Sequence, residues 1–253
     1  MKKNLFKTRL LSFATFCGLV LAFASCANED VAQGTTGTDS ENDKNLTTFV
    51  AGDEAKTRTT MDYNTGAFYW EAGDYIYVKD DDGTWQKSAN APTSKVAAFK
   101  YKVPGKFTAS TSYKVYYLGK SSSGNQVTIS ATQSQTTPDN TEHFGTSGDY
   151  GSATATKITG KQQFQFTLEH QPAYLIFQPY TSNTILNKCY LTKIEVTSDN
   201  DIAETYTINT STDNLDASAG GKQIVLTTKS TSGAYTNGFP LTNSSASRTT
   251  NGA

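Results

Sequence analysis

The segment 163–168 alternates strictly between polar and apolar side chains, with Phe164, Phe166 and Leu168 at every second position. A period of two residues is that of a β-strand, because successive side chains of a strand point to opposite faces of the sheet. Clean alternation is typical of an antiparallel sheet with one face on the core and the other in water. This segment therefore commits part of the chain to such a sheet.

Shorter segments of the same kind recur between turn residues, and the 14 tyrosines and 13 phenylalanines of the chain also favour strands. We expect roughly ten to twelve strands and no helix beyond the N-terminal segment, which predicts an all-β, antiparallel, two-sheet β-sandwich with Greek-key links. The expected strands are 46–50, 67–70, 74–79, 84–86, 95–103, 113–118, 126–130, 163–168, 173–178, 190–197, 205–209 and 223–228. The nearly continuous apolar stretch 173–178 predicts a central strand, whereas the polar stretch 131–160 predicts a long loop.

Residues 1–25 have the three zones of a secretory signal peptide. A positively charged end carrying Lys2, Lys3, Lys7 and Arg9 precedes an apolar run over 10–23, which ends in small residues. The run of about 14 residues is too short for a bilayer core, which takes about 20 helical residues. We therefore expect export and removal of this segment rather than a transmembrane helix.

The small residues Ala24 and Ser25 directly before Cys26 resemble the lipobox of bacterial lipoproteins. The resemblance implies that the Cys26 thiol is acylated, that the signal is cut just before it, and that lipid holds the chain to a membrane. The other interpretation is an ordinary signal peptide with a chance cysteine. Acidic residues at 29–30 resemble a surface-export tag of Bacteroidota lipoproteins, or they belong to a solvated tether.

The pattern divides the chain into four parts. After the signal peptide, 1–25, we expect a flexible polar tether over 26–45 and a β-sandwich domain over 46–228. Residues 229–253 form a polar tail or the start of a missing C-terminal domain. Export leaves Cys189 as the one free cysteine, so there is no disulfide framework, and we interpret it as a small buried hydrophobe.

Composition and motifs argue against catalysis. The mildly acidic chain has no electrostatic footprint for nucleic acid. His143 and His170 have no metal-ligand spacing, and Asp80–Asp82 fits a solvated hairpin turn better than a calcium loop. No nucleophile elbow or phosphate loop occurs, so we expect no enzyme activity, cofactor or metal site. Trp70 and Trp85 could form a sugar-stacking platform, although core positions are favoured.

Three motifs together resemble one family. Residues 56–60 read Lys-Thr-Arg-Thr-Thr, Trp70–Val78 has the form Trp-x-x-Gly-Asp-x-Ile-x-Val, and Phe166–Phe177 reads Phe-x-Leu-x-His-x-x-Ala-x-Leu-x-Phe. With the lipobox and the tether, their order resembles the fimbrillin (Mfa-like) family of Bacteroidota, which comprises type V pilins and their tip or anchor subunits. The resemblance covers about 46–228 and implies a transthyretin-like sandwich.

The resemblance also implies an assembly mechanism. In that family a trypsin-like protease cuts after an arginine that follows the first strand, and a strand from the neighbouring subunit fills the groove left behind. On this chain 46–50 would be removed and Arg58 would be the cleavage site, although an ordinary loop arginine is the alternative. The family usually has a second sandwich, whereas only about 25 weakly patterned residues follow position 228 here.

The leading hypothesis is a surface-exposed, lipid-anchored outer-membrane protein that serves as a fimbrial subunit or anchor and supports adhesion. Its partners would be other pilus subunits, joined by strand addition, and the membrane, through Cys26. The alternative is a surface-anchored β-sandwich lipoprotein that binds a glycan or another protein.

Overall fold

The computed structural model describes residues 45–52, 60–61, 68–122, 124–217 and 220–241. Their regular structure is almost entirely strand, as the alternating pattern predicts. In these ranges no helix is both long enough and apolar enough to span a bilayer. Cys26 and Arg58 lie outside the described residues, as do the whole signal peptide and nearly all of the tether.

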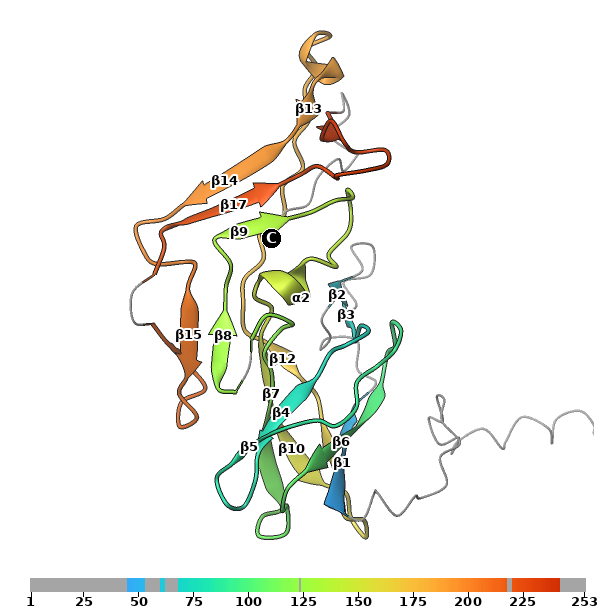
Figure 1. The fold of residues 1–253 in the computed structure, drawn as a ribbon, viewed down its shortest axis with the longest axis vertical. Helices are drawn as coiled ribbons and strands as arrows, with labels where there is room; N and C mark the ends of the chain where they lie inside the picture. The colour runs from blue at the N-terminus through green and yellow to red at the C-terminus, as the bar shows by residue number, and fades with distance from the viewer. Residues whose placement is uncertain (1–44, 53–59, 62–67, 123, 218–219, 242–253) are drawn as a thin grey trace, which may run out of the picture. The chain divides into compact units, whose positions relative to one another are not determined.

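The largest sheet follows the path β5-β4-β7-β10-β11-β1-β6, and the short strand β12 also pairs with β10 (Figure 1). Its strands are β1 (Leu46–Ala51), β4 (Ile76–Lys79), β5 (Trp85–Lys87), β6 (Phe99–Pro104), β7 (Ser112–Tyr117), β10 (Gly151–Lys157), β11 (Gln163–Phe166) and β12 (Glu169–His170). Neighbouring strands on this path are antiparallel, except that β1 runs parallel to β11.

The two ends of this path are joined by hydrogen bonds. The amide of Ala89, just after β5, donates to the carbonyl of Lys102 in β6 at 2.7 Å. The Asn90 side chain adds bonds to the backbone of the same strand, to the Lys100 carbonyl at 3.0 Å and from the Lys102 amide at 2.7 Å. The sheet therefore curls so that one of its faces surrounds a single core.

That core is unusually aromatic. Its buried members come from six of the seven strands on the path and from adjoining loops, and they are Phe49, Ala51, Trp70, Ile76, Val78, Tyr101, Val103, Phe107, Tyr113, Val115, Tyr117, Ala153, Ala155, Phe164, Phe166 and Leu168. The three apolar residues of the alternating segment, Phe164, Phe166 and Leu168, all belong to this core, as predicted. Trp70 is 1% exposed, so it occupies a core position and presents no platform for a sugar.

A second, smaller sheet of order β16-β15-β8 covers part of the outer face of the large one. Its strands are β8 (Gln126–Thr128), β15 (Thr205–Ile208) and β16 (Leu215–Asp216). Val127 and Ile208 pack with Tyr77 and Tyr116, which project from the outer face of β4 and β7. The large sheet is thus buried on both faces at this point, and only its inner face encloses the main core.

The other elements are short. A third sheet has the order β14-β17-β9, and two pairs of two-residue strands, β13-β18 and β2-β3, complete the β-structure. Their bounds are β2 (Thr60–Met61), β3 (Phe68–Tyr69), β9 (Thr132–Ser134), β13 (Tyr190–Leu191), β14 (Lys193–Thr197), β17 (Gln223–Thr227) and β18 (Phe239–Pro240), with the helical turns α2 (Phe144–Ser147) and η2 (Leu186–Lys188).

Three expectations from the sequence are wrong. The polar stretch 131–160 is not a long loop, because it contains β9, α2 and the seven-residue strand β10. The apolar stretch 173–178 is not a central strand: it has no regular structure, and Leu175 is 49% exposed. Cys189 is exposed rather than buried. In β10 the inward residues are the small Gly151, Ala153 and Ala155, which give no strong apolar signal although bulky core neighbours need them for space.

Candidate functional site

The first strand lies inside the large sheet, with a hydrogen-bonded neighbour on each side. β1 pairs with β6 over its whole length, from Leu46 opposite Pro104 to Ala51 opposite Phe99. Its other edge pairs in parallel with β11, where Thr48 to Ala51 face Gln163 to Phe166. The strand that comes first in the sequence therefore holds together two strands from later in the chain.

Phe49 is the residue of β1 that fills the core. Its side chain is fully buried, and its ring stacks on Phe164 with centroids 5.1 Å apart and planes inclined by 18°. Phe107 meets the same ring edge-on at 5.2 Å. Two positions later Ala51, 2% exposed, also faces the core. Removing β1 would leave a groove with a deep position where the Phe49 ring lies and a shallow position where Ala51 lies.

The chain beyond β1 is tied to β11 by one more bond. The Gly52 amide donates to the carbonyl of Phe166 at 2.9 Å, and the described residues then stop until Thr60. Arg58, the expected cleavage residue, falls in this interval, so the structure does not describe its surroundings. Cys26 likewise belongs to the part that is not described.

The Trp-x-x-Gly-Asp motif builds a turn on the edge of the core. Gly73 has a φ of +81°, a backbone conformation that favours glycine. Asp74 is fully buried, and its carboxylate accepts bonds from the Glu71 amide at 2.7 Å and from the Tyr117 hydroxyl at 3.0 Å. Burial, with a contribution from Asp74, raises the pKa of Tyr117 well above its usual value, so this hydroxyl stays a donor. The motif is therefore structural.

The His-containing motif forms a second buried polar group. His170 in β12 places Nδ1 3.0 Å from an Oδ1 atom of Asp149, and the Tyr174 hydroxyl donates to the same oxygen. Asp149 is 1% exposed. The Tyr174 ring stacks on Phe144 with centroids 4.4 Å apart. These contacts fix the chain as it leaves the large sheet, and His170 is a strand-end residue, as predicted.

The acidic turn 80–82 connects β4 to β5, as predicted, but its first residue is not solvated. Asp80 is 9% exposed and accepts bonds from the amides of Asp82 and Thr84 and from the side chain of Gln86. Hydrogen bonding, above all from the Tyr113 hydroxyl, lowers the pKa of Asp81 to about 2. Within the described residues no three His, Cys, Asp or Glu side chains are grouped to hold a metal ion.

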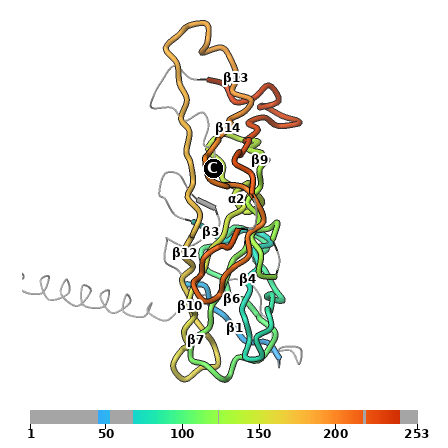
Figure 2. Tube along the Cα trace, turned by 90° about the vertical axis from the view of Figure 1, so that its left-hand side faces the viewer, coloured from blue at the N-terminus to red at the C-terminus, as the bar shows by residue number. Residues whose placement is uncertain are grey.

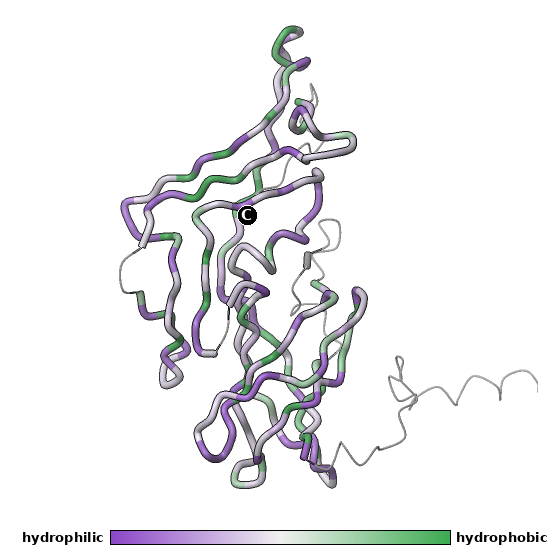
Figure 3. Tube along the Cα trace, viewed as in Figure 1, coloured by the Kyte–Doolittle hydropathy of each residue, from purple (hydrophilic) through white to green (hydrophobic). Residues whose placement is uncertain are grey.

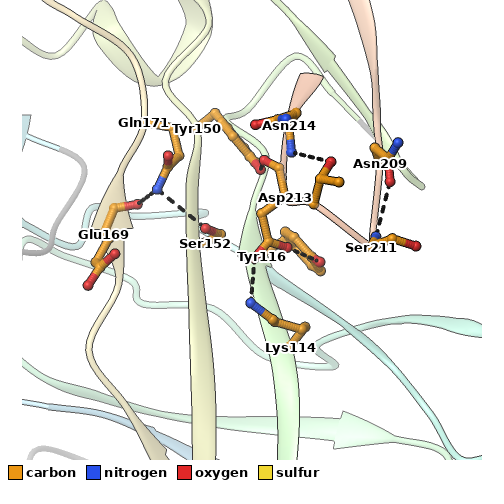
Figure 4. A network of polar contacts seen from close by, with 11 residues as sticks. Lys114, Tyr116, Tyr150, Ser152, Glu169, Gln171, Asn209, Ser211, Asp213 and Asn214 are labelled. Atoms are coloured by element: carbon orange, nitrogen blue, oxygen red, sulfur yellow. Dashed lines mark hydrogen bonds and ion pairs between the residues drawn. The ribbon is translucent and has the colours of Figure 1, made fainter. Parts of the chain in front are cut away.

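A further polar network joins the small sheet to the large one, and no local sequence pattern predicts it. Asp213, in the turn between β15 and β16, is bonded by the Lys114 ammonium and by the Tyr116 hydroxyl at 2.8 Å, and its carbonyl accepts from the Tyr150 hydroxyl at 3.2 Å. Figure 4 shows these three side chains converging on Asp213. Its φ of +59° lies in the left-handed region, which aspartate tolerates better than most residues.

Beside this network is an open polar pocket of about 560 Å³ on the outer face of β10 and β11. Its lining includes Ser152, Thr154, Thr156, Gln165 and Glu169, together with the Lys114–Asp213 ion pair. Ser152 also contacts the Gln171 side chain (Figure 4). Hydroxyl, amide and charged groups in one hollow can bind a small polar molecule, but they contain no arrangement of nucleophile and base.

Comparison with known proteins finds no relative for this chain. No protein-family model, no curated protein and no solved structure matches it.

Proposed function

We propose that the protein is a fimbrillin-like lipoprotein of the outer-membrane surface, a pilus subunit or anchor whose first strand is exchanged for a strand of a neighbouring subunit. The observation that carries the proposal is the position of β1. It is the first strand of the described residues, it lies between β6 and β11, and it contributes the fully buried Phe49 to the core. Removal of this internal strand would leave a groove with two free edges, and a single cut after it would separate it from the later strands.

The proposal includes a finer description of the fold, a transthyretin-like Greek-key sandwich. In it β4, β7 and β10 form one layer, and β11, β1 and β6 form the other. The curled path of the large sheet supports this, because inward residues of both sets of strands, such as Val115 and Phe164, belong to one core. Two layers with a shared core are the usual arrangement of a β-sandwich.

Cleavage after Arg58 is the proposed trigger. It would separate β1, together with the lipid on Cys26, from everything that follows in the chain. β1 would still be held by its ladders and by Phe49, so an incoming strand must compete for the same groove. Such a strand regains the backbone hydrogen bonds of β6 and β11 and refills the aromatic position, which supplies affinity and specificity. The lipid would then serve transport, and it anchors permanently only if Arg58 stays uncut.

A binding module remains the second candidate, because the pocket beside Asp213 is hollow and polar. Sugar hydroxyls could bond to Ser152, Thr154 and Glu169. Trp70 cannot assist, since it is buried in the core. The proposal would be surface attachment through a small polar ligand rather than through polymer contacts.

An arginine-specific protease tests the leading proposal, with Arg58→Lys as the matched control. The full chain is treated with the protease, and the products are followed by mass spectrometry and by size-exclusion chromatography with light scattering. Arginine also occurs at positions 9 and 248, so cuts there are expected in both proteins. We expect the cut after Arg58, release of the fragment that contains β1 and growth of polymers only in the protein that keeps Arg58. A clean cut that leaves only monomers with β1 retained contradicts the exchange mechanism.

A further inference from the structure

Large apolar side chains that are exposed to solvent are confined to one short part of the described residues. All of them fall between Leu175 and Tyr190, and they are Leu175, Ile176, Tyr180, Ile185, Leu186 and Tyr190. Ile185 is 75% exposed. Figure 3 shows the hydrophobic colour on the turn above β13, where η2 lies. A concentration of this kind on one segment marks an interaction surface, whereas scattered exposed residues do not.

Just where this apolar part begins, the backbone of residues 173–178 also lacks pairing within the described residues. Residues 173–178 have no regular structure, and no backbone hydrogen bond joins them to any other described residue. Figure 2 shows the chain continuing from β12 as a long extended trace along one side of the view. Extended backbone with free N–H and C=O groups is the edge to which another strand adds.

This segment is nevertheless fixed at both ends. At its start, Tyr174 is held by Asp149 and by its stack on Phe144. After it, the Leu241 amide donates to the carbonyl of Cys189 at 3.1 Å, beside the β13-β18 pair. An extended segment held at both ends loses little further freedom when a strand adds to it, which favours binding.

The unpaired backbone selects the class of partner. A lipid surface could cover the apolar side chains, but hydrocarbon offers nothing to the free N–H and C=O groups, each of which would remain unsatisfied. A polypeptide strand satisfies both. Pro172 and Pro179 bracket the segment, and because proline has no N–H they limit the pairing strand to 173–178.

The charge pattern favours a second copy of the same chain. From Gln171 to Asn187 there is no charged residue, so two copies can approach antiparallel without like-charge repulsion. Identical segments that pair about a twofold axis form the commonest kind of symmetric interface. An axis at Ile176 places this residue opposite its own copy and Leu175 opposite Phe177, giving cross-strand apolar pairs.

We propose that residues 173–178 are a dimerisation strand that pairs antiparallel with the same residues of a second copy of this chain. The proposed surface is separate from the β1 groove, so the dimer needs neither cleavage at Arg58 nor strand exchange. It joins two subunits side by side, and it gives the exposed apolar residues of this segment a partner.

Sedimentation equilibrium on the full chain tests the proposal, with Cys26→Ser to prevent acylation and Cys189→Ser to prevent chance disulfides. We expect a monomer–dimer equilibrium whose dissociation constant rises about tenfold or more in the double variant Leu175→Lys/Ile176→Lys. The matched control is Ser182→Lys/Thr184→Lys, which adds the same charge outside the strand and should leave the equilibrium unchanged. Equal weakening by both pairs, or a chain that is monomeric at all concentrations, overturns the proposal.

Cross-linking checks the register in the same background. Under mild oxidation Ile176→Cys should give a covalent dimer, whereas Ile185→Cys, which is in the same apolar region but outside the strand, should give far less. Equal yields would indicate unspecific apolar association and would overturn strand pairing. Flotation with phosphatidylcholine vesicles tests a lipid surface as the alternative partner. If the chain forms no dimer but binds the vesicles, and only Leu175→Lys/Ile176→Lys abolishes this binding, the segment contacts a membrane and the dimer proposal is overturned. The Arg58 digestion is unaffected by either result.

Discussion

Phe49 and Phe164 stack with centroids 5.1 Å apart, and so the first strand of the chain is joined through its largest side chain to a strand more than a hundred residues later. The two residues are also register partners in the parallel pair β1-β11. The contact therefore combines backbone and side-chain pairing at the same point. It is the contact that an exchanged strand would have to reproduce.

Replacing Phe49 tests how much the core depends on β1. Phe49→Ala removes a fully buried ring from between Phe164 and Phe107, and we expect a loss of about 3–5 kcal/mol in the free energy of unfolding. Val50→Ala, on the other side of the same strand and only half-buried, should cost clearly less. Urea denaturation followed by tryptophan fluorescence measures both. Equal losses of unfolding free energy in the two variants would mean that Phe49 does not contribute more to the core than Val50.

His143 should make the protein sensitive to acid. Burial lowers the pKa of His143 to about 4, from 6.5 in an exposed histidine. As the pH falls between these values the unfolded chain takes up the proton first, so stability decreases through this window, by at most about 3 kcal/mol. In His143→Phe this part of the pH dependence should disappear. The check is urea denaturation of both proteins between pH 7 and pH 4, and parallel curves would contradict it.

Asp213 should depend more on its backbone and hydrogen bonds than on its charge. The ion pair with Lys114 is partly exposed to solvent, and surface pairs contribute at most about 1 kcal/mol. Asp213→Asn keeps an oxygen for the Tyr116 hydroxyl and tolerates the left-handed φ, so we expect a loss below about 1 kcal/mol. Asp213→Ala keeps neither feature and should lose about 2 kcal/mol. Thermal denaturation of the two variants separates these contributions, and identical losses would refute the assignment.

Much of the main sheet could be predicted from the sequence, because polar and apolar side chains alternate along several of its strands. Phe164, Phe166 and Leu168 face the core as their spacing requires. The acidic turn between β4 and β5 and the strand-end position of His170 also follow from local pattern. These features are determined by residues that are close together in the sequence, so the sequence alone reveals them.

The features that could not be predicted depend on distant partners. The alanines of β10 are buried because aromatic residues from other strands surround them, and no local pattern reveals this. Residues 173–178 look like a buried strand, yet within the described residues no strand pairs with them. Asp213 meets Lys114 across 99 positions of sequence, so its polar network has no sequence signature. Arg58 and Cys26 were found by motif alone, and their roles remain proposals.

Rebinding of the first strand tests the central claim most directly. The chain is cut after Arg58 and freed of its N-terminal fragment, and a fluorescent peptide with the sequence of residues 45–52 is titrated in and followed by fluorescence polarisation. We predict saturable one-to-one binding that is lost with a Phe49→Ala peptide and that competes with polymer growth. Polymers that grow equally well while the groove is filled by this peptide, or equal binding of the two peptides, would contradict the account.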